Sequence, residues 1–85
     1  MRHVSDPELR MSDITLDMRG LKCPLPVLRA RKAMQGAAPG AVLRIVATDP
    51  GTVRDFQAFC QATGHILVEQ AERDGEFSFR IRKAG

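Results

Sequence analysis

An almost unbroken apolar run, AVLRIVAT at residues 41–48, constrains the fold of this chain of 85 residues more than any other feature. It is rich in β-branched residues and follows Pro39 and Gly40, which end the segment before it. Such a run predicts an inner strand with a parallel neighbour. Because parallel strands are joined by a crossover, usually a helix, the preceding residues should supply one.

The residues before this run do supply a strand and a helix. In ITLDM, residues 14–18, apolar and polar side chains alternate as in a strand with one buried face. Over residues 23–37 the apolar side chains recur at helical spacing, at Val27, Ala30, Met34 and Ala37. Strand, helix and strand therefore form a right-handed βαβ unit.

The C-terminal half predicts a second helix and a hairpin. Thr52 and Asp55 resemble a capping box, and Gly64 is a suitable helix end. The apolar side of this helix comprises Val53, Phe56, Phe59 and Cys60, with Thr63. Arg73-Asp74-Gly75 then joins two strands, the last with strict alternation. The order βαβαββ predicts an α+β fold, a two-layer α/β sandwich with both helices on one face of a four-stranded mixed sheet.

Length and composition limit the chain to one small domain. We expect a flexible tail over residues 1–12, with Met1 or Met11 as the true start, and one domain over residues 13–85.

Neither a membrane-spanning run nor a secretory signal is visible, so a cytoplasmic protein without membrane contact is expected. The net charge of +3 leaves room for an acidic partner. Four Phe without Tyr or Trp make a base-stacking surface and direct nucleic-acid binding unexpected.

Cys23, in GLKCPLP, is the candidate catalytic residue. If it caps the helix, Pro24 and Pro26 stiffen the first turn. The helix dipole, Arg19 and Lys22 would then stabilise the thiolate and lower its pKa. The residues alone leave a second reading open, in which Cys23 is a small buried side chain.

The remaining cysteine and the histidines add little to this site. Cys60 is expected in the core, and no resolving thiol lies one helical turn from Cys23, which favours single-thiol chemistry. His65 could approach Cys23 only through the fold. No metal-ligand spacing is present, so neither a metal nor a cofactor is expected.

The chain resembles the TusA (SirA-like) sulfur-carrier family from Leu16 to about Lys83. The resemblance rests on the Gly-Leu-x-Cys-Pro-x-Pro (CPxP) motif in LDMRGLKCPLP and on the stretch ATDPGTVRDFQAFCQATGH. It implies a sheet with strand order 1-2-4-3, similar to the C-terminal domain of translation initiation factor three.

The same resemblance implies that Cys23 accepts a sulfane sulfur as a persulfide and relays it. The donor would be a cysteine desulfurase or a rhodanese, and the acceptor a DsrE-type or other sulfur acceptor protein. The pathways served in the family include tRNA 2-thiouridine synthesis, molybdenum-cofactor enzymes and sulfur oxidation. A monomer that acts as a sulfurtransferase together with partner enzymes is expected.

A helical wheel places four further residues away from the apolar side, and we expect them to form a partner-binding collar: Leu25, Leu28, Arg29 and Lys32. The alternative is an ordinary surface with scattered leucines. A second basic patch, Arg44, Arg80 and Arg82, is expected on the open face of the sheet. The rival function is a nucleic-acid-binding or regulatory interaction module without sulfur chemistry.

Overall fold

The computed structural model describes residues 13–84 and confirms the predicted order of elements. In chain order these are β1 (Asp13–Met18), α2 (Leu25–Gln35), β2 (Val42–Ala47), α3 (Gly51–Thr63), β3 (Ile66–Arg73) and β4 (Glu76–Arg82). The predicted tail and the alternative start at Met11 lie outside the described residues.

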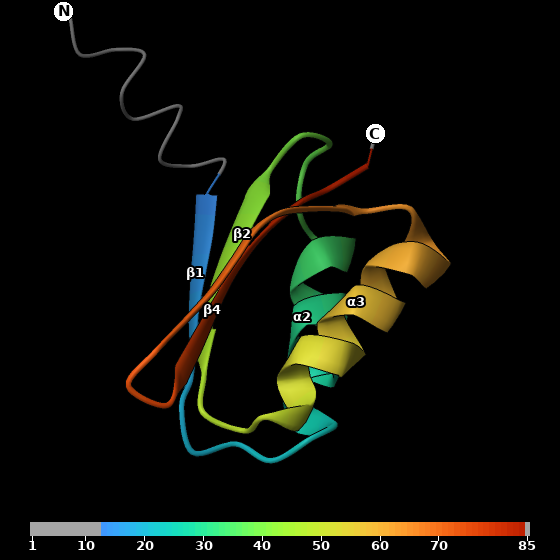
Figure 1. Ribbon diagram of the computed structural model, residues 1–85. Helices are drawn as coiled ribbons and strands as arrows, with labels where there is room; N and C mark the ends of the chain where they lie inside the picture. The colour runs from blue at the N-terminus through green and yellow to red at the C-terminus, as the bar shows by residue number, and fades with distance from the viewer. Residues whose placement is uncertain (1–12, 85) are drawn as a thin grey trace, which may run out of the picture.

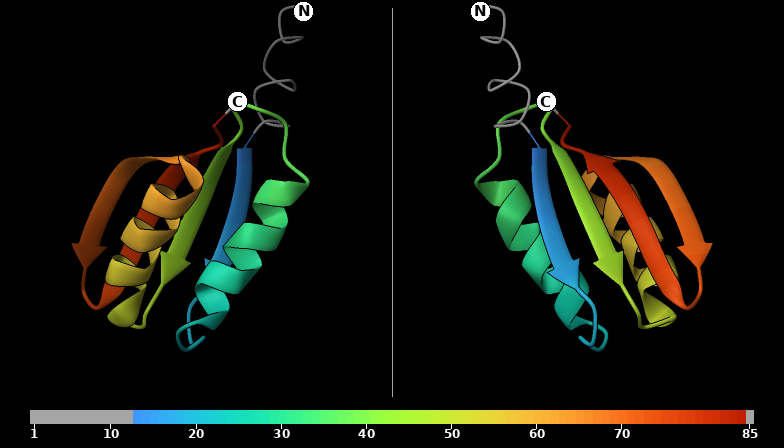
Figure 2. Two further views of the ribbon diagram at one scale, coloured as in Figure 1. Left: turned by 90° about the vertical axis from the view of Figure 1, so that its right-hand side faces the viewer. Right: turned by 90° about the vertical axis from the view of Figure 1, so that its left-hand side faces the viewer.

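The sheet has the order β1-β2-β4-β3, as the resemblance implied. β1 runs parallel to β2, and β4 pairs antiparallel with both β2 and β3. Both helices lie on one face of this sheet and leave the other face open (Figures 1 and 2). The predicted two-layer α+β sandwich is therefore confirmed.

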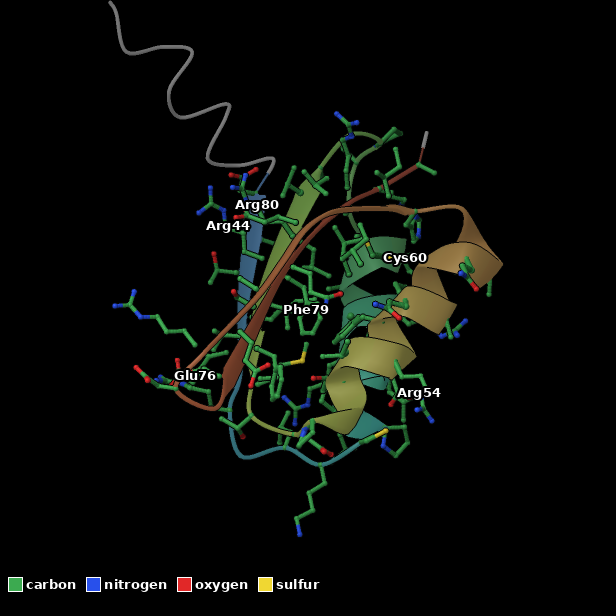
Figure 3. The ribbon with its side chains drawn as sticks, viewed as in Figure 1. Arg44, Arg54, Cys60, Glu76, Phe79 and Arg80 are labelled. Atoms are coloured by element: carbon green, nitrogen blue, oxygen red, sulfur yellow. The ribbon has the colours of Figure 1, made fainter. Side chains whose placement is uncertain are left out.

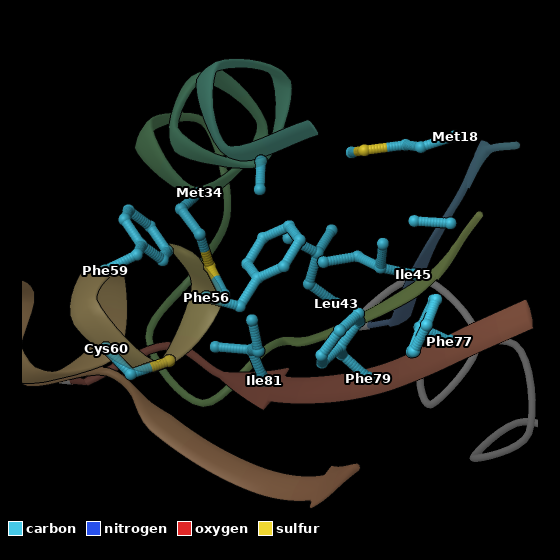
Figure 4. Close-up of a cluster of buried hydrophobic side chains, with 12 residues drawn as sticks. Met18, Met34, Leu43, Ile45, Phe56, Phe59, Cys60, Phe77, Phe79 and Ile81 are labelled. Carbon is cyan, nitrogen blue, oxygen red and sulfur yellow. The ribbon is translucent and has the colours of Figure 1, made fainter. Parts of the chain in front are cut away.

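The core fills the space between the sheet and the two helices (Figure 4). The ring of Phe56 lies 4.9 Å from that of Phe79 on β4 and 6.4 Å from that of Phe59. Burial of each such side chain contributes about 1.5–3 kcal/mol before chain entropy is counted. On β2, Leu43 and Ile45 are buried while Arg44 between them is exposed, because no helix covers the second face.

The β3–β4 hairpin turns on Asp74 and Gly75, whose φ angles of 53° and 80° are both positive. This is the backbone of a type I′ turn, for which Asp-Gly is a preferred sequence. β3 forms one edge of the sheet, and its side chains are largely exposed. The hairpin thus completes the sheet, whereas β2 and β4 carry most of its buried residues.

The loops after β1 and β2 lie side by side, because parallel strands end at the same edge of a sheet (Figure 1). The Gly20 N–H donates to Thr48 Oγ1 at 2.9 Å and joins the two loops. In open α/β sheets, this carboxyl edge is where ligands and reactive groups gather. Among residues 13–84, neither helix has the length and apolar character needed to cross a membrane.

Candidate functional site

Cys23 lies in the loop between β1 and α2, and its side chain is exposed and free. The reading of Cys23 as a small buried residue is therefore wrong. The prediction that it caps the helix is also wrong, because α2 begins at Leu25 and its N-cap is Pro24. The Pro24 carbonyl accepts the first helical hydrogen bond, from the Leu28 N–H at 3.1 Å. The Cys23–Pro24 peptide bond is cis.

The two prolines of the motif have different surroundings. Pro24 is exposed at the N-cap, whereas Pro26 in the first turn of α2 is buried among the core residues. Both fit a helix start, where an absent N–H leaves no intrahelical bond unmade. Pro26 therefore also anchors the start of α2 in the core, which the sequence had not indicated.

Two acidic side chains from the second loop and α3 hold Cys23. Its backbone N–H donates to Asp49 Oδ2 at 2.6 Å, and its thiol Sγ donates to Asp55 Oδ2. Asp49 also accepts the Gly51 N–H through Oδ1 at 3.1 Å. A Cβ placed on Gly51 would lie 3.6 Å from Cys23 Cβ and 3.7 Å from Sγ. The sulfur therefore lies against the first turn of α3.

The acidic neighbours raise the pKa of the Cys23 thiol from 9.0 to about 11. The largest cause is the hydrogen bond to Asp55, followed by desolvation and by the charges of Asp55 and Asp49. Loss of the thiol proton would place a negative sulfur against a negative carboxylate. The predicted lowering of this pKa is wrong, and at neutral pH Cys23 is a thiol.

Arg19 and Lys22 do not support a thiolate in the predicted way. Arg19 pairs with Asp17 at 2.8 Å and with Glu76 at 3.6 Å. The hydrogen bonds from Arg19 lower the pKa of Asp17 to about 2. Lys22 helps to lower the pKa of Asp49, after the larger effect of the two backbone N–H groups that this carboxylate accepts. Neither cation contributes to the shift of the Cys23 pKa.

The four predicted collar residues share the exposed side of α2. Leu25 and Leu28 are 45% and 52% exposed, which is high for leucine, and Arg29 and Lys32 are exposed beside them. Within residues 13–84, neither cation of this collar makes an ion pair. The opposite side of the helix is buried at Pro26, Ala30 and Met34. The collar thus begins two residues after Cys23 and continues along α2.

The other candidates lie elsewhere. Cys60 is buried, as predicted, and burial raises the pKa of its thiol. His65 follows the C-terminal end of α3, where its ring lies 5.6 Å from that of Phe59. Since α3 has 13 residues, about 1.5 Å each, it separates His65 from the Cys23 end by about 20 Å. A Cys–His pair is therefore absent from the described residues.

Two arginines of the predicted basic patch, Arg44 and Arg80, lie on the side of the sheet away from the helices (Figure 3). Carboxylates partly neutralise them. Arg80 pairs with Glu69 at 2.6 Å and Arg44 with Asp13 at 3.8 Å. Among residues 13–84, no three His, Cys, Asp or Glu side chains gather as metal ligands would. The described part of the open face therefore presents charges of both signs, and Arg82, the third residue of the predicted patch, is exposed.

Asp49 and Asp55 are site residues that the sequence analysis missed, since it named Asp55 only as part of a capping box. The predicted capping box is not formed, because the N-cap of α3 is Pro50 and no side chain caps this helix. Thr52 is instead buried, and its hydroxyl donates to the Asp49 carbonyl at 2.7 Å. The parallel pairing of the first two strands was the available signal, because it brings the residues after each strand together.

Comparison with known proteins identifies the family. Residues 14–83 match the model of the family described as Sulfurtransferase TusA. The sulfur carrier protein TusA of Allochromatium vinosum is 50% identical over 72 residues, covering 85% of this chain and 95% of that protein. TusA of Pseudomonas aeruginosa is 46% identical over 71 residues, covering 84% and 90%.

A solved structure with the same fold supports this family assignment. The SirA-like protein from Desulfitobacterium hafniense superposes with a TM-score of 0.74 at 28% identity, covering 85% of this chain and 99% of that one. The exposed cysteine of the CPxP motif lies within the matched region, on a fold that the neighbour shares. The chain therefore belongs to the TusA sulfurtransferase family.

Proposed function

We propose that this protein is a sulfur carrier that holds a sulfane sulfur as a persulfide on Cys23. The observation that carries the proposal is the exposed, free thiol of Cys23, in the family motif and at the carboxyl edge of the sheet. The two relatives above are named sulfur carrier proteins. A thiol at an exposed loop is accessible to a donor enzyme and then to an acceptor.

Transfer needs no cofactor of its own. The Cys23 sulfur attacks the outer sulfur of the donor's persulfide, the donor's sulfur–sulfur bond breaks, and the donor leaves as a thiol. Cys23 then carries the persulfide, and attack by an acceptor thiol on its outer sulfur restores the Cys23 thiol. No electrons are gained or lost overall, so the transfer needs no oxidant or reductant. In this proposal the protein acts as a sulfurtransferase in a relay with partner enzymes.

The collar of Leu25, Leu28, Arg29 and Lys32 is the proposed docking surface. Two exposed leucines stand beside two cations that make no ion pair within the described residues, and together they give an apolar contact with a basic rim. This suits a partner whose own sulfur site lies in an apolar surface with an acidic rim. A cysteine desulfurase or rhodanese is the proposed donor and a DsrE-type protein the proposed acceptor, in the cytoplasm.

The fate of the sulfur is proposed as tRNA 2-thiouridine synthesis, molybdenum-cofactor enzymes or sulfur oxidation. Under this proposal the acceptor decides which of these pathways receives the sulfur. An acceptor that removes the sulfur from loaded Cys23, while the others do not, would identify the pathway. The comparison requires each acceptor to be incubated with the same loaded protein.

Mass spectrometry tests the carrier function directly. After incubation with a cysteine desulfurase and L-cysteine, the wild-type chain is expected to gain the mass of one sulfur on the peptide containing Cys23. Cys23→Ser should lose this gain, and Cys60→Ser should keep it. Sulfur found on Cys60 alone, or on neither cysteine, would refute the proposal.

A further inference from the structure

Asp55 contacts the reacting sulfur and has no role in the relay described so far. Its carboxylate accepts the hydrogen bond of the Cys23 thiol, and within residues 13–84 its side chain makes no other hydrogen bond or ion pair. A half-buried carboxylate in the second turn of α3 that serves only one exposed thiol is not required for the helix. Its contact therefore points to the chemistry of Cys23.

We propose that Asp55 is a catalytic residue that takes the proton from Cys23 during sulfur transfer and returns it to the departing thiolate. The proposal rests on the proposed carrier function of Cys23. It assigns to the chain its own general base, so that the partner has to supply only the sulfane sulfur.

The proposed step balances without an oxidant. The Cys23 thiol gives its proton to Asp55 Oδ2 while Sγ bonds to the outer sulfur of a protonated donor persulfide. The donor's sulfur–sulfur bond breaks, and its electron pair leaves on the inner sulfur. Asp55 then protonates that sulfur, so that the donor leaves as a thiol, Cys23 holds a persulfide, and the carboxylate is restored.

The surroundings of Cys23 fix the direction of the thiol. The bond from the Cys23 N–H to Asp49 holds the backbone, and the close approach of Gly51 leaves room for Sγ beside Asp55. Gly51 and Asp55, the two residues of α3 nearest this sulfur, also line a surface depression together with Arg54. This depression is the place that the proposal assigns to the incoming persulfide.

The charges that face Cys23 explain why a base is needed. Asp55 and Asp49 are both negative, and Lys22 from the same loop interacts with Asp49. In this environment the free thiolate is a minor form at neutral pH. Proton transfer at the moment of attack avoids the scarce species, which is the circumstance that favours general base catalysis.

Two reactions of the same thiol separate this role from a structural one. Asp55→Asn keeps the shape of the side chain but removes its charge and its basicity. Alkylation by iodoacetamide, which consumes thiolate, should become several-fold faster at neutral pH, and its midpoint should fall from about 11 toward 9.0. Sulfur uptake from glutathione persulfide should instead become about tenfold slower or more.

Glutathione persulfide serves as the donor because it does not depend on docking at the collar. Asp55→Glu should recover part of the uptake, and Glu72→Gln, the same change of charge on β3, should leave both reactions unchanged. Circular dichroism verifies the fold of each variant. Uptake by Asp55→Asn at the wild-type rate would overturn the proposal, as would equal slowing of both reactions, which indicates only a displaced sulfur.

Failure of the proposed function has a different signature. In that case the wild-type chain takes up no sulfur on Cys23 from glutathione persulfide or from a charged cysteine desulfurase. If the wild-type chain does take up sulfur, and Asp55→Asn leaves the pH profile of that uptake unchanged, only the proposed role of Asp55 is refuted.

Discussion

Cys23 and Asp49, 26 positions apart in the sequence, are joined by a hydrogen bond of 2.6 Å from a backbone N–H to a carboxylate oxygen. The bond connects the loop after β1 to the loop after β2. Since the same carboxylate also accepts the Gly51 N–H, it aligns the cysteine with the first turn of α3. The site therefore depends on a contact between two loops rather than on either loop alone.

Asp49→Ala should loosen this connection. Both backbone N–H groups lose their acceptor, so their hydrogen exchange, followed by NMR, should accelerate by about tenfold. Asp49→Asn keeps one acceptor oxygen and should give an intermediate rate. The matched control is Asp13→Ala, which removes an exposed carboxylate at the far end of β1. Unchanged exchange at Cys23 and Gly51 in Asp49→Ala would show that the loops are held by other contacts.

The pKa of Cys23 predicts a specific loss of stability in alkali. The folded-state pKa of about 11 exceeds the ordinary 9.0, so between these values the folded chain binds more protons than the unfolded chain. The stabilising contribution is complete below pH 9 and is lost as the pH rises through about 11. Thermal unfolding of wild type and Cys23→Ser should therefore converge or cross over this range. Parallel curves would contradict the shift.

The collar predicts a defect that depends on the donor. Arg29→Glu with Lys32→Glu should slow sulfur uptake from a cysteine desulfurase by about tenfold, because the basic rim then repels an acidic partner. Uptake from glutathione persulfide should be unchanged. The matched control reverses Arg44 and Arg82 on the open face of the sheet. Should the control impair uptake instead, the partner docks on the sheet.

Stability should depend on the helix–sheet core and not on the collar. Phe56 is fully buried against Phe79, and Phe56→Ala should lower the free energy of unfolding by about 3–5 kcal/mol. Leu28→Ala, at an exposed position, should change it by less than about 0.5 kcal/mol. Urea denaturation measures both. A large loss in Leu28→Ala would mean that the collar is part of the packed structure.

The periodicity of the sequence was sufficient for the fold because each element has a clear local pattern. The alternation of Phe77, Phe79 and Ile81 matches the buried face of β4, and Asp74-Gly75 matches the hairpin turn. The order of the strands came from the family resemblance. These features are local, or belong to the family as a whole, and so they survive without knowledge of tertiary contacts.

The electrostatics of Cys23 could not be read in the same way. Arg19 and Lys22 are its neighbours in the sequence, whereas the groups that govern its pKa, Asp55 and Asp49, come from another loop and helix. The start of α2 was also displaced, since the turn from Lys22 to Leu25 precedes the helix. The prediction relied on cations that are close to Cys23 in the sequence. The carboxylates that are close to it in space come near only through the pairing of the strands.

The contact between Cys23 and Asp55 changes how thiol-labelling data on this protein should be interpreted. Slow labelling is commonly taken as a sign that a cysteine is buried, yet Cys23 is exposed and its thiolate is suppressed by a neighbouring charge. Unfolding removes that neighbour. The exposed cysteine should therefore label faster in urea than in buffer, and in a footprinting experiment it would be mistaken for part of the core.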